Sequence, residues 1–575
     1  MRSAAEIPVR PRRRFLPEEL SFESWEALQP WLQKLLDQPV NSVAELEEWM
    51  KDFSEVESVI TEEEGWRFIR HTCDTASEDC DKAYNFFVEE IDPKLAPYFD
   101  QLNRKLASSP FLSQLPKGKY DIWLRAVKRE IEIYREENIP LFTEIDKLRQ
   151  QYTKCISEMT VEVNGAELTL PQAGNHLKSA DRNHRREVYE KIAARRAQDR
   201  RVLGDQFDAL CALRQKVAAN AGFENYRDYK FAELGRFDYT PQDCFDFHDA
   251  VRTEVVPAMN AVDEKRRRDL GLDRLRPYDM DMDVKGRAPL KPFESAAELV
   301  EKTIVCLQRI HPRFAEYIDV MRAMGRFDID SRKSKAPGGY NYPLHETGVP
   351  FIFMNAASAH RDVVTMVHEA GHAVHSFLMR DLQLKAFRDN PSEVDELASM
   401  AMELITMEHW DVFYPDPEDL RRARAEHLEK IIDALCWIAA VDKFQHWVYE
   451  NKNHTAEQRS AAWLQIEKEL GSGVIDWSGY ETAHATLWHR QLHIYEMPFY
   501  YIEYGFAQLG ALAVWRNYKR DPKKAIANYE KALRLGYTRS IADMYAAAGV
   551  RFDFSREYVR ELITFVREEL ERYTS

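Results

Sequence analysis

A chain of 575 residues is longer than one hydrophobic core usually supports, so two or more packed parts are expected. Apolar residues make up 45% and charged residues 31%, and the net charge of -16 argues against nucleic acid or an anionic membrane as a partner. No uncharged run approaches the roughly 18 residues of a membrane span and no apolar leader follows Met1, so we expect a cytoplasmic protein. The 7 cysteines are scattered without a C-x-x-C pair, which favours reduced thiols over disulfides or a cysteine zinc site. We therefore expect any metal to be bound by residues other than cysteine.

Most of the sequence has helical periodicity, so we predict a mainly α protein with an N-terminal helical region over 1–195 and a larger region over 196–575. Two interruptions alternate like strands. In "TVEVNGAELTL", residues 160–170, Asn164-Gly165 stands between alternating segments and predicts a β-hairpin. Residues 335–355 combine a glycine-rich loop with the strand-like run "PFIFMN", which predicts a small β-sheet just before the stretch 365–375.

The stretch "TMVHEAGHAVH", residues 365–375, contains an H-E-x-x-H motif. On a helix His368 and His372 differ by about 40° and project from one face, so their imidazoles can reach one cation. Glu369 falls beside them and can contact a metal-bound water as a general base. An apolar stripe on the opposite side anchors the helix, namely Val363, Val367, Ala370, Val374 and Phe377. On the motif alone, a buried helix with incidental histidines stays open as an alternative.

A third ligand is expected from the next predicted helix, "NPSEVDELASMAMELITMEHW". Glu396 and Glu403 share its polar side, and two histidines plus one carboxylate form a recurrent catalytic zinc set. We therefore predict Glu396 as the third ligand, and Glu403 as a hydrogen-bond partner of a ligand histidine. His375 lies one turn further along the first helix, so packing or a supporting hydrogen bond is favoured over ligation.

At these residues the sequence resembles the thimet oligopeptidase family of zinc metallopeptidases, most closely its oligoendopeptidase F and Pz-peptidase branch. The resemblance extends to E-x-x-S-x-x-x-E at 396–403, "DKFQHWVYEN" at 442–451 and "RQLHIYEMPFYYIEYGFAQLGALAVWRNY" at 490–518. It implies a two-lobed, mainly helical fold of the gluzincin type (H-E-x-x-H plus a glutamate) with a deep substrate channel and one zinc ion. It also implies endopeptidase action on short peptides, with the ligands and base named above.

Members of that family use histidine and tyrosine side chains from a downstream segment, here "HIYEMPFYYIEYGF". The resemblance assigns His493 and Tyr504 to the transition state, where they could donate hydrogen bonds to an oxyanion. Tyr500 and Tyr501 are candidates for substrate contact, with aromatic packing as the open alternative. Pro498 suits a first helical turn, which would place Tyr500 and Tyr504 on one helical face.

The strand-like "PFIFMN" is expected to offer a sheet edge to an extended peptide, with Gly338 and Gly339 of "APGGYNY" closing over it. An ordinary turn beside a structural sheet edge is the alternative. The predicted function is a zinc-dependent endopeptidase of short peptides. A peptide-binding protein with a structural metal, or a zinc hydrolase of a non-peptide amide, remains the competing hypothesis.

Overall fold

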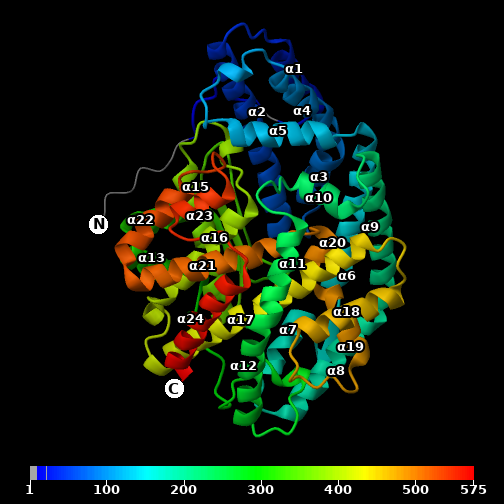
Figure 1. The fold of residues 1–575 in the computed structure, drawn as a ribbon, viewed down its shortest axis with the longest axis vertical. Coiled ribbons are helices and arrows are strands. Elements are labelled where there is room, and N and C mark those ends of the chain that lie inside the picture. Colours follow the sequence, from blue (N-terminus) through cyan, green and yellow to red (C-terminus); the bar gives the residue numbers. More distant parts are fainter. Residues whose placement is uncertain (1–9, 21, 575) are drawn as a thin grey trace. The chain divides into compact units, whose positions relative to one another are not determined.

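The computed structural model describes residues 10–20 and 22–574, and it is mainly α-helical, as predicted (Figure 1). It divides into two compact units. Unit 1 comprises Met1–Ile139, Lys291–Leu420 and Gly510–Phe552, and unit 2 comprises Pro140–Leu290, Arg421–Leu509 and Asp553–Ser575. The division falls inside three helices: α6 (Ile139–Ser157) after its first residue, α17 (Pro417–Glu450) and α21 (Ile502–Arg520). The boundary expected near residue 195 lies inside helix α8 (Arg182–Gln198) of unit 2.

Unit 1 combines helices with a small three-stranded sheet. Ser42 and Ser295 start α2 and α13 by accepting a hydrogen bond from the backbone three residues on, as N-cap residues do. Helices α13, α15, α16, α22 and α23 lie side by side (Figure 1), and α14 packs against α13 and α15. The helices of unit 1 are α1 (Trp25–Asp37), α2 (Val43–Cys73), α3 (Glu78–Phe86), α4 (Asp92–Ala107), α5 (Asp121–Ile133), α13 (Ala296–Ile310), α14 (Pro312–Ala323), α15 (His360–Met379), α16 (Ser392–Met407), α22 (Pro522–Leu533) and α23 (Ile541–Ala547).

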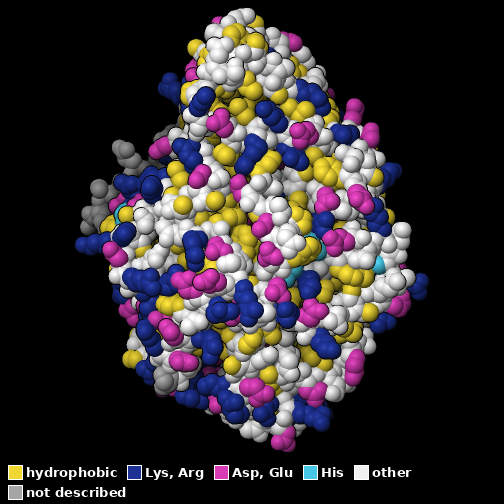
Figure 2. Space-filling view, in the orientation of Figure 1, with side chains coloured by type: hydrophobic (Ala, Val, Ile, Leu, Met, Phe, Trp, Pro, Cys, Tyr) yellow, Lys and Arg dark blue, Asp and Glu magenta, His cyan; other side chains and the backbone are white. Residues whose placement is uncertain are grey.

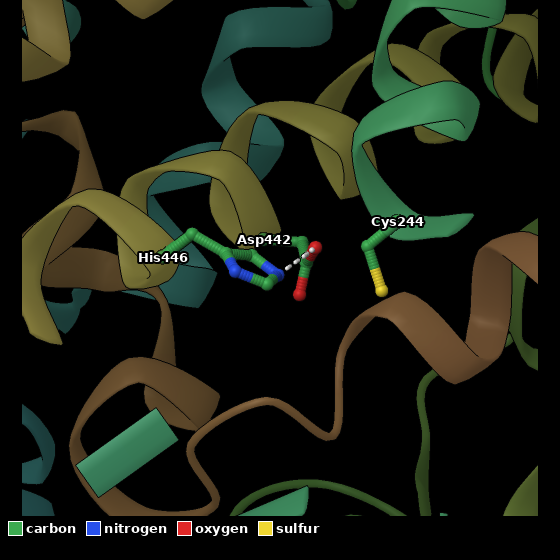
Figure 3. A group of neighbouring side chains, drawn as sticks. All are labelled: Cys244, Asp442 and His446. Atoms are coloured by element: carbon green, nitrogen blue, oxygen red, sulfur yellow. Dashed lines mark ion pairs between the residues drawn. The ribbon is translucent and has the colours of Figure 1, made fainter. Parts of the chain in front are cut away.

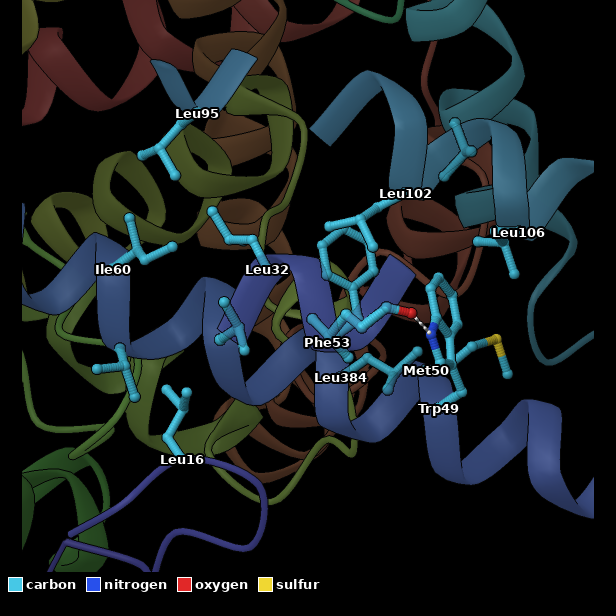
Figure 4. Packing of buried hydrophobic residues seen from close by; sticks show 14 of the residues in the cluster. Leu16, Leu32, Trp49, Met50, Phe53, Ile60, Leu95, Leu102, Leu106 and Leu384 are labelled. Atoms are coloured by element: carbon cyan, nitrogen blue, oxygen red, sulfur yellow. Dashed lines mark hydrogen bonds between the residues drawn. The ribbon is translucent and has the colours of Figure 1, made fainter. Parts of the chain in front are cut away.

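A hydrophobic core joins α1, α2 and α4 (Figure 4). Leu32, Trp49 and Leu102 are fully buried in it, and each such side chain contributes about 1.5–3 kcal/mol by leaving water. The Trp49 indole N–H donates to the carbonyl of Leu35 at 2.9 Å, so the one polar atom of this ring is satisfied inside the core. The core fixes α2, against which the sheet of unit 1 rests.

The sheet of unit 1 has the order β3 (Phe327–Asp330), β5 (Phe351–Ala356), β4 (Tyr340–Tyr342). Strand β5 pairs in parallel with β3 and antiparallel with β4. The run "PFIFMN" is therefore the central strand, and the expectation that it offers an open edge is wrong, because its backbone groups are paired on both sides. Within the described residues, β4 is an edge strand of this sheet.

Strand β4 lies between α2 and the helix that carries H-E-x-x-H. The ring of Tyr342 packs on Gly65 of α2, where any Cβ would collide with it. The hydroxyl of Tyr340 lies 2.6 Å from that of Thr72, also in α2. Asn341 points the other way, as alternation along a strand requires, and its side-chain amide donates to the carbonyl of Glu369 at 3.3 Å. The small sheet thus sits beside the motif, as predicted.

The described part of unit 2 consists of helices and their connections, with one hairpin, β1 (Thr160–Val163) and β2 (Ala166–Thr169), and an isolated bridge between Leu275 and Ile475. Asn164 and Gly165 have φ of 54° and 79°, the left-handed turn conformation that the sequence predicted. The remaining helices of this unit are α7 (Leu170–Gly174), α8, α9 (Arg200–Asn220), α10 (Tyr226–Glu233), α11 (Pro241–Ala250), α12 (Val256–Asp269), α18 (Ala456–Leu470), α19 (Glu481–Ala485), α20 (Leu492–Glu496) and α24 (Arg556–Thr574), together with nearly all of α6 (Ile139–Ser157).

Acidic and basic side chains are mixed over the face shown in Figure 2 rather than gathered by sign. Among the described residues, no helix is both long enough and apolar enough to cross a membrane.

Candidate active site

Helix α15 presents the H-E-x-x-H residues from its middle. The carboxylate of Asp362 starts this helix by accepting from the backbone N–H groups of Ala357 and Ala359 at 2.7 and 2.9 Å. A negative charge in the first turn also suits the helix dipole. The predicted apolar stripe is buried and holds the helix in unit 1: Val363, Val367, Ala370, Val374 and Phe377.

Helices α15 and α16 approach closely at Gly371. A Cβ there would lie 2.7 Å from Ser399 Cα and 2.8 Å from the carbonyl oxygen of Ala398, both in α16. Only glycine permits this spacing, because any larger residue would push the helices apart. The glycine inside H-E-A-G-H therefore brings the carboxylates of α16 up to the histidines of α15.

The structure brings His368, His372 and Glu396 together. One donor atom from each lies within 4.8 Å of the others. His368 Nε2 is 3.3 Å and His372 Nε2 is 3.7 Å from the same oxygen of Glu396. Two imidazole nitrogens and one carboxylate oxygen form a donor set that fits zinc and leaves a coordination position open.

Hydrogen bonds hold this donor set in place. His368 Nδ1 lies 2.6 Å from Glu403, which leaves Nε2 facing Glu396, and the Ser399 hydroxyl donates to Glu396 at 2.9 Å. His375 is buried outside the triplet, with its Nδ1 3.0 Å from Asp395. Glu403 and His375 thus lie where they can support the site without being among its three grouped donors.

Glu369 is buried next to the triplet, and its Oε2 has no hydrogen-bond partner among the described residues. Burial raises the pKa of this carboxyl to about 7, so it can exchange a proton near neutral pH. Burial lowers the pKa of His372 to about 4, which keeps that imidazole neutral, the form a metal binds. Burial opposes ionisation of Glu396, but the contacts with His368 and His372 prevail and lower its pKa to about 2.

The downstream histidine and tyrosines lie in unit 2 and cluster with one another. The ring centroid of His493 is 4.8 Å from that of Tyr501, 5.8 Å from Tyr504 and 5.9 Å from Tyr500. Tyr504 is 5.4 Å from both Tyr500 and Tyr501. The four residues therefore form one aromatic group, whose part in catalysis stays a prediction.

Pro498 does not start the helix that follows. Helix α21 begins at Ile502, and Tyr500 precedes it. Phe499 has a φ of 65°, a conformation that is uncommon for a bulky residue. Its N–H donates to Gln445 at 2.8 Å, and Arg236 donates to its carbonyl. These distant partners override the helix-starting tendency of proline, so Tyr500 and Tyr504 are not one turn apart on a helix as expected.

The two glycines predicted to contact substrate come directly before edge strand β4. Gly338 has a φ of 98°, and its carbonyl accepts from the side-chain amide of Asn355 at 3.0 Å. A Cβ at Gly339 would lie 3.3 Å from the carbonyl of Phe353. The contact of Asn341 with Glu369 was not predicted; strand alternation in "YNY" indicates only that Asn341 faces away from the two tyrosines.

Comparison with known proteins gives a consistent assignment. The sequence profile of peptidase family M3 matches residues 175–564, and that of the peptidase M3 N-terminal domain matches residues 15–134. The oligoendopeptidase F homolog of Borreliella burgdorferi is 22% identical over 74% of this chain and 72% of its own length. Oligopeptidase PepF of Bacillus subtilis is 22% identical over 67% of this chain and 57% of its own length.

Solved structures agree with this assignment over nearly the whole chain. A structure of Pz peptidase A with an inhibitor matches with a TM-score of 0.91 and 27% identity, covering 97% of this chain and 99% of that one. A putative oligoendopeptidase F matches with a TM-score of 0.90 and 28% identity over the same shares of the two chains. The chain therefore belongs to peptidase family M3, in the branch that includes oligoendopeptidase F and Pz-peptidase.

Proposed function

We propose that the protein is a zinc-dependent endopeptidase that hydrolyses internal bonds of short peptides. The observation that carries this proposal is the triplet of His368, His372 and Glu396 donors beside the buried carboxylate of Glu369. A site that only bound peptides would not need a base at that place. Family membership and the oligopeptidase names of the relatives support peptides as the substrate class.

His368, His372 and Glu396 would hold the zinc ion, which supplies Lewis-acid chemistry by polarising a carbonyl and acidifying water. Glu369 takes a proton from the water that attacks the scissile carbonyl, and then returns it to the leaving amine. Its raised pKa suits both transfers near neutral pH. Glu403 keeps the proton of His368 on Nδ1, so that Nε2 is free to bind.

The edge strand β4, rather than the central strand β5, would bind the substrate. An extended peptide can add to an exposed sheet edge through main-chain hydrogen bonds. Strand β4 brings such an edge beside α15, because Asn341 contacts the backbone of Glu369. Gly338 and Gly339 would let the chain before β4 come close to the peptide. His493 and Tyr504 would donate to the oxyanion, and Tyr500 and Tyr501 would contact the substrate.

A short internally quenched peptide, blocked at both ends, tests the function. We expect cleavage at an internal bond, identified by mass spectrometry, that stops on chelation and returns with zinc. A long unfolded protein should be cleaved far more slowly. Release of single terminal residues from an unblocked peptide alone would indicate an exopeptidase. Binding without cleavage would favour a peptide-binding protein, and hydrolysis of non-peptide amides alone would change the substrate class.

A further inference from the structure

A second group of metal-ligand side chains lies buried in unit 2. Cys244 and His248 stand four residues apart on α11, and Asp442 and His446 stand four apart on α17. Each pair therefore projects from one face of its helix. His248 Nε2 lies 2.8 Å from Asp442 Oδ2, which joins the two faces. All four residues are at most 3% exposed.

Three of these residues point their donor atoms at one another. The sulfur of Cys244, a carboxylate oxygen of Asp442 and a ring nitrogen of His446 all lie within 4.8 Å of one another. Figure 3 shows the Asp442 carboxylate between the His446 ring and the sulfur of Cys244. His446 Nε2 is 3.2 Å from Asp442 Oδ2. The three donors come from two helices, so one ion could join α11 to α17.

Asp442, His248 and His446 each have a buried polar atom without a hydrogen-bond partner among the described residues. Asp442 Oδ1, His248 Nδ1 and His446 Nδ1 are buried without a hydrogen-bond partner in the part of the chain that the structure describes, while His446 Nε2 faces Asp442 Oδ2. The His446 ring is surrounded by apolar rings, with centroids at 4.7 Å for Phe245 and 5.2 Å for Phe499. A buried carboxylate and imidazole in such surroundings are costly unless something binds them.

We propose that Cys244, Asp442 and His446 bind a second zinc ion, distinct from the one expected at His368, His372 and Glu396. A thiolate, an imidazole and a carboxylate together suit zinc, whereas calcium and magnesium prefer oxygen ligands alone. The thiol of Cys244 releases its proton to solvent as the metal binds. His248 holds Asp442 through Oδ2 and leaves Oδ1 for the ion.

The ion would also help to hold in place the segment around Phe499, which precedes the candidate substrate-binding residues Tyr500 and Tyr501. The ring of His446 packs edge-on against Phe499, and the neighbouring Gln445 accepts from the Phe499 N–H at 2.8 Å. Phe499 has a positive φ and directly precedes Tyr500. Fixing His446 by a metal bond would hold this unusual backbone conformation, so His446 has a positioning role rather than a catalytic one.

Metal analysis of the full chain, after equilibration with buffered zinc, tests the second site. We expect the Cys244→Ala variant to bind one zinc ion fewer per chain than wild type. Cys436→Ala is the matched control, because Cys436 is a buried cysteine in α17 outside the group, and it should keep the wild-type content. Equal zinc contents in wild type and Cys244→Ala would overturn the proposal.

Cobalt substitution separates the two sites, since only the second contains sulfur. We expect a sulfur-to-cobalt charge-transfer band in wild type, in Cys436→Ala and in a variant with both His368 and His372 replaced by alanine. The band should be lost in Cys244→Ala, because this variant lacks the proposed sulfur ligand. No band in cobalt-loaded wild type would overturn the proposal whether or not Cys244→Ala folds. A band that survives loss of the two histidines supports the second site even if the proposed peptidase activity fails.

Discussion

Replacing Gly371 by alanine would test how the fold aligns the proposed zinc ligands. The added methyl would lie 2.7 Å from Ser399 Cα, whereas ordinary contact begins at 3.4 Å, so α15 and α16 must separate there by about 0.7 Å. Metal-ligand distances tolerate about 0.2 Å. Because His368 and His372 lie on one helix and Glu396 on the other, the separation would spread the donors. We expect zinc affinity to fall at least about tenfold and kcat/KM by up to about 100-fold.

The same substitution should also lower stability. Overpacking costs about 1–3 kcal/mol, against about 1 kcal/mol gained in helix propensity. Zinc titration against a chelator and thermal unfolding measure the two effects. Gly204→Ala in α9 is the control, because nothing lies within 4 Å of its added Cβ, and it should keep zinc affinity and gain stability. Wild-type zinc affinity and activity in Gly371→Ala would refute the role of close helix packing.

Three further changes probe single residues. Glu403→Gln removes the carboxylate 2.6 Å from His368 Nδ1 and should weaken zinc binding about 10- to 100-fold in chelator competition; unchanged affinity would contradict its supporting role. Tyr504→Phe should lower kcat by about 10²–10³ at unchanged zinc content, and an equal loss in Tyr500→Phe would refute the assignment to the oxyanion. Burial raises the pKa of Glu57 from 4.5 to about 7, so its native state retains a proton that the unfolded chain releases, and stability falls as pH rises through that window. Glu57→Gln should therefore raise the Tm relative to wild type at pH about 8 but not below pH about 4.5, and equal shifts at both would count against this linkage.

Much of what could be predicted from the sequence depends on residues that are close together in the chain. The H-E-x-x-H motif places His368 and His372 on one helical face through helix geometry alone. The Asn164-Gly165 turn follows from the backbone conformations that these two residues tolerate, and both have positive φ. Such features depend on neighbours in the sequence, so they can be derived without knowing the fold.

Features that depend on distant partners escaped prediction. The central place of β5 depends on parallel pairing with β3, which only the folded chain reveals. The conformation of Phe499 depends on Gln445 and Arg236, far away in the sequence. Cys244 likewise groups with Asp442 and His446, which are far away in the sequence, and the scattered cysteines suggested no metal site. The grouping of Glu396 with the histidines was predicted from the usual zinc ligand set, but the close helix approach at Gly371 that produces it was not.

The Glu369→Gln variant tests the central claim most directly. Glutamine keeps the size of the side chain but cannot accept the proton, and Glu369 is not one of the three grouped donors. Zinc content and turnover of an internally quenched peptide should be measured on the same sample. We predict unchanged zinc at the His368, His372 and Glu396 site with kcat/KM lowered by about 10²–10⁴. Turnover at the wild-type rate with zinc bound would contradict the proposed mechanism.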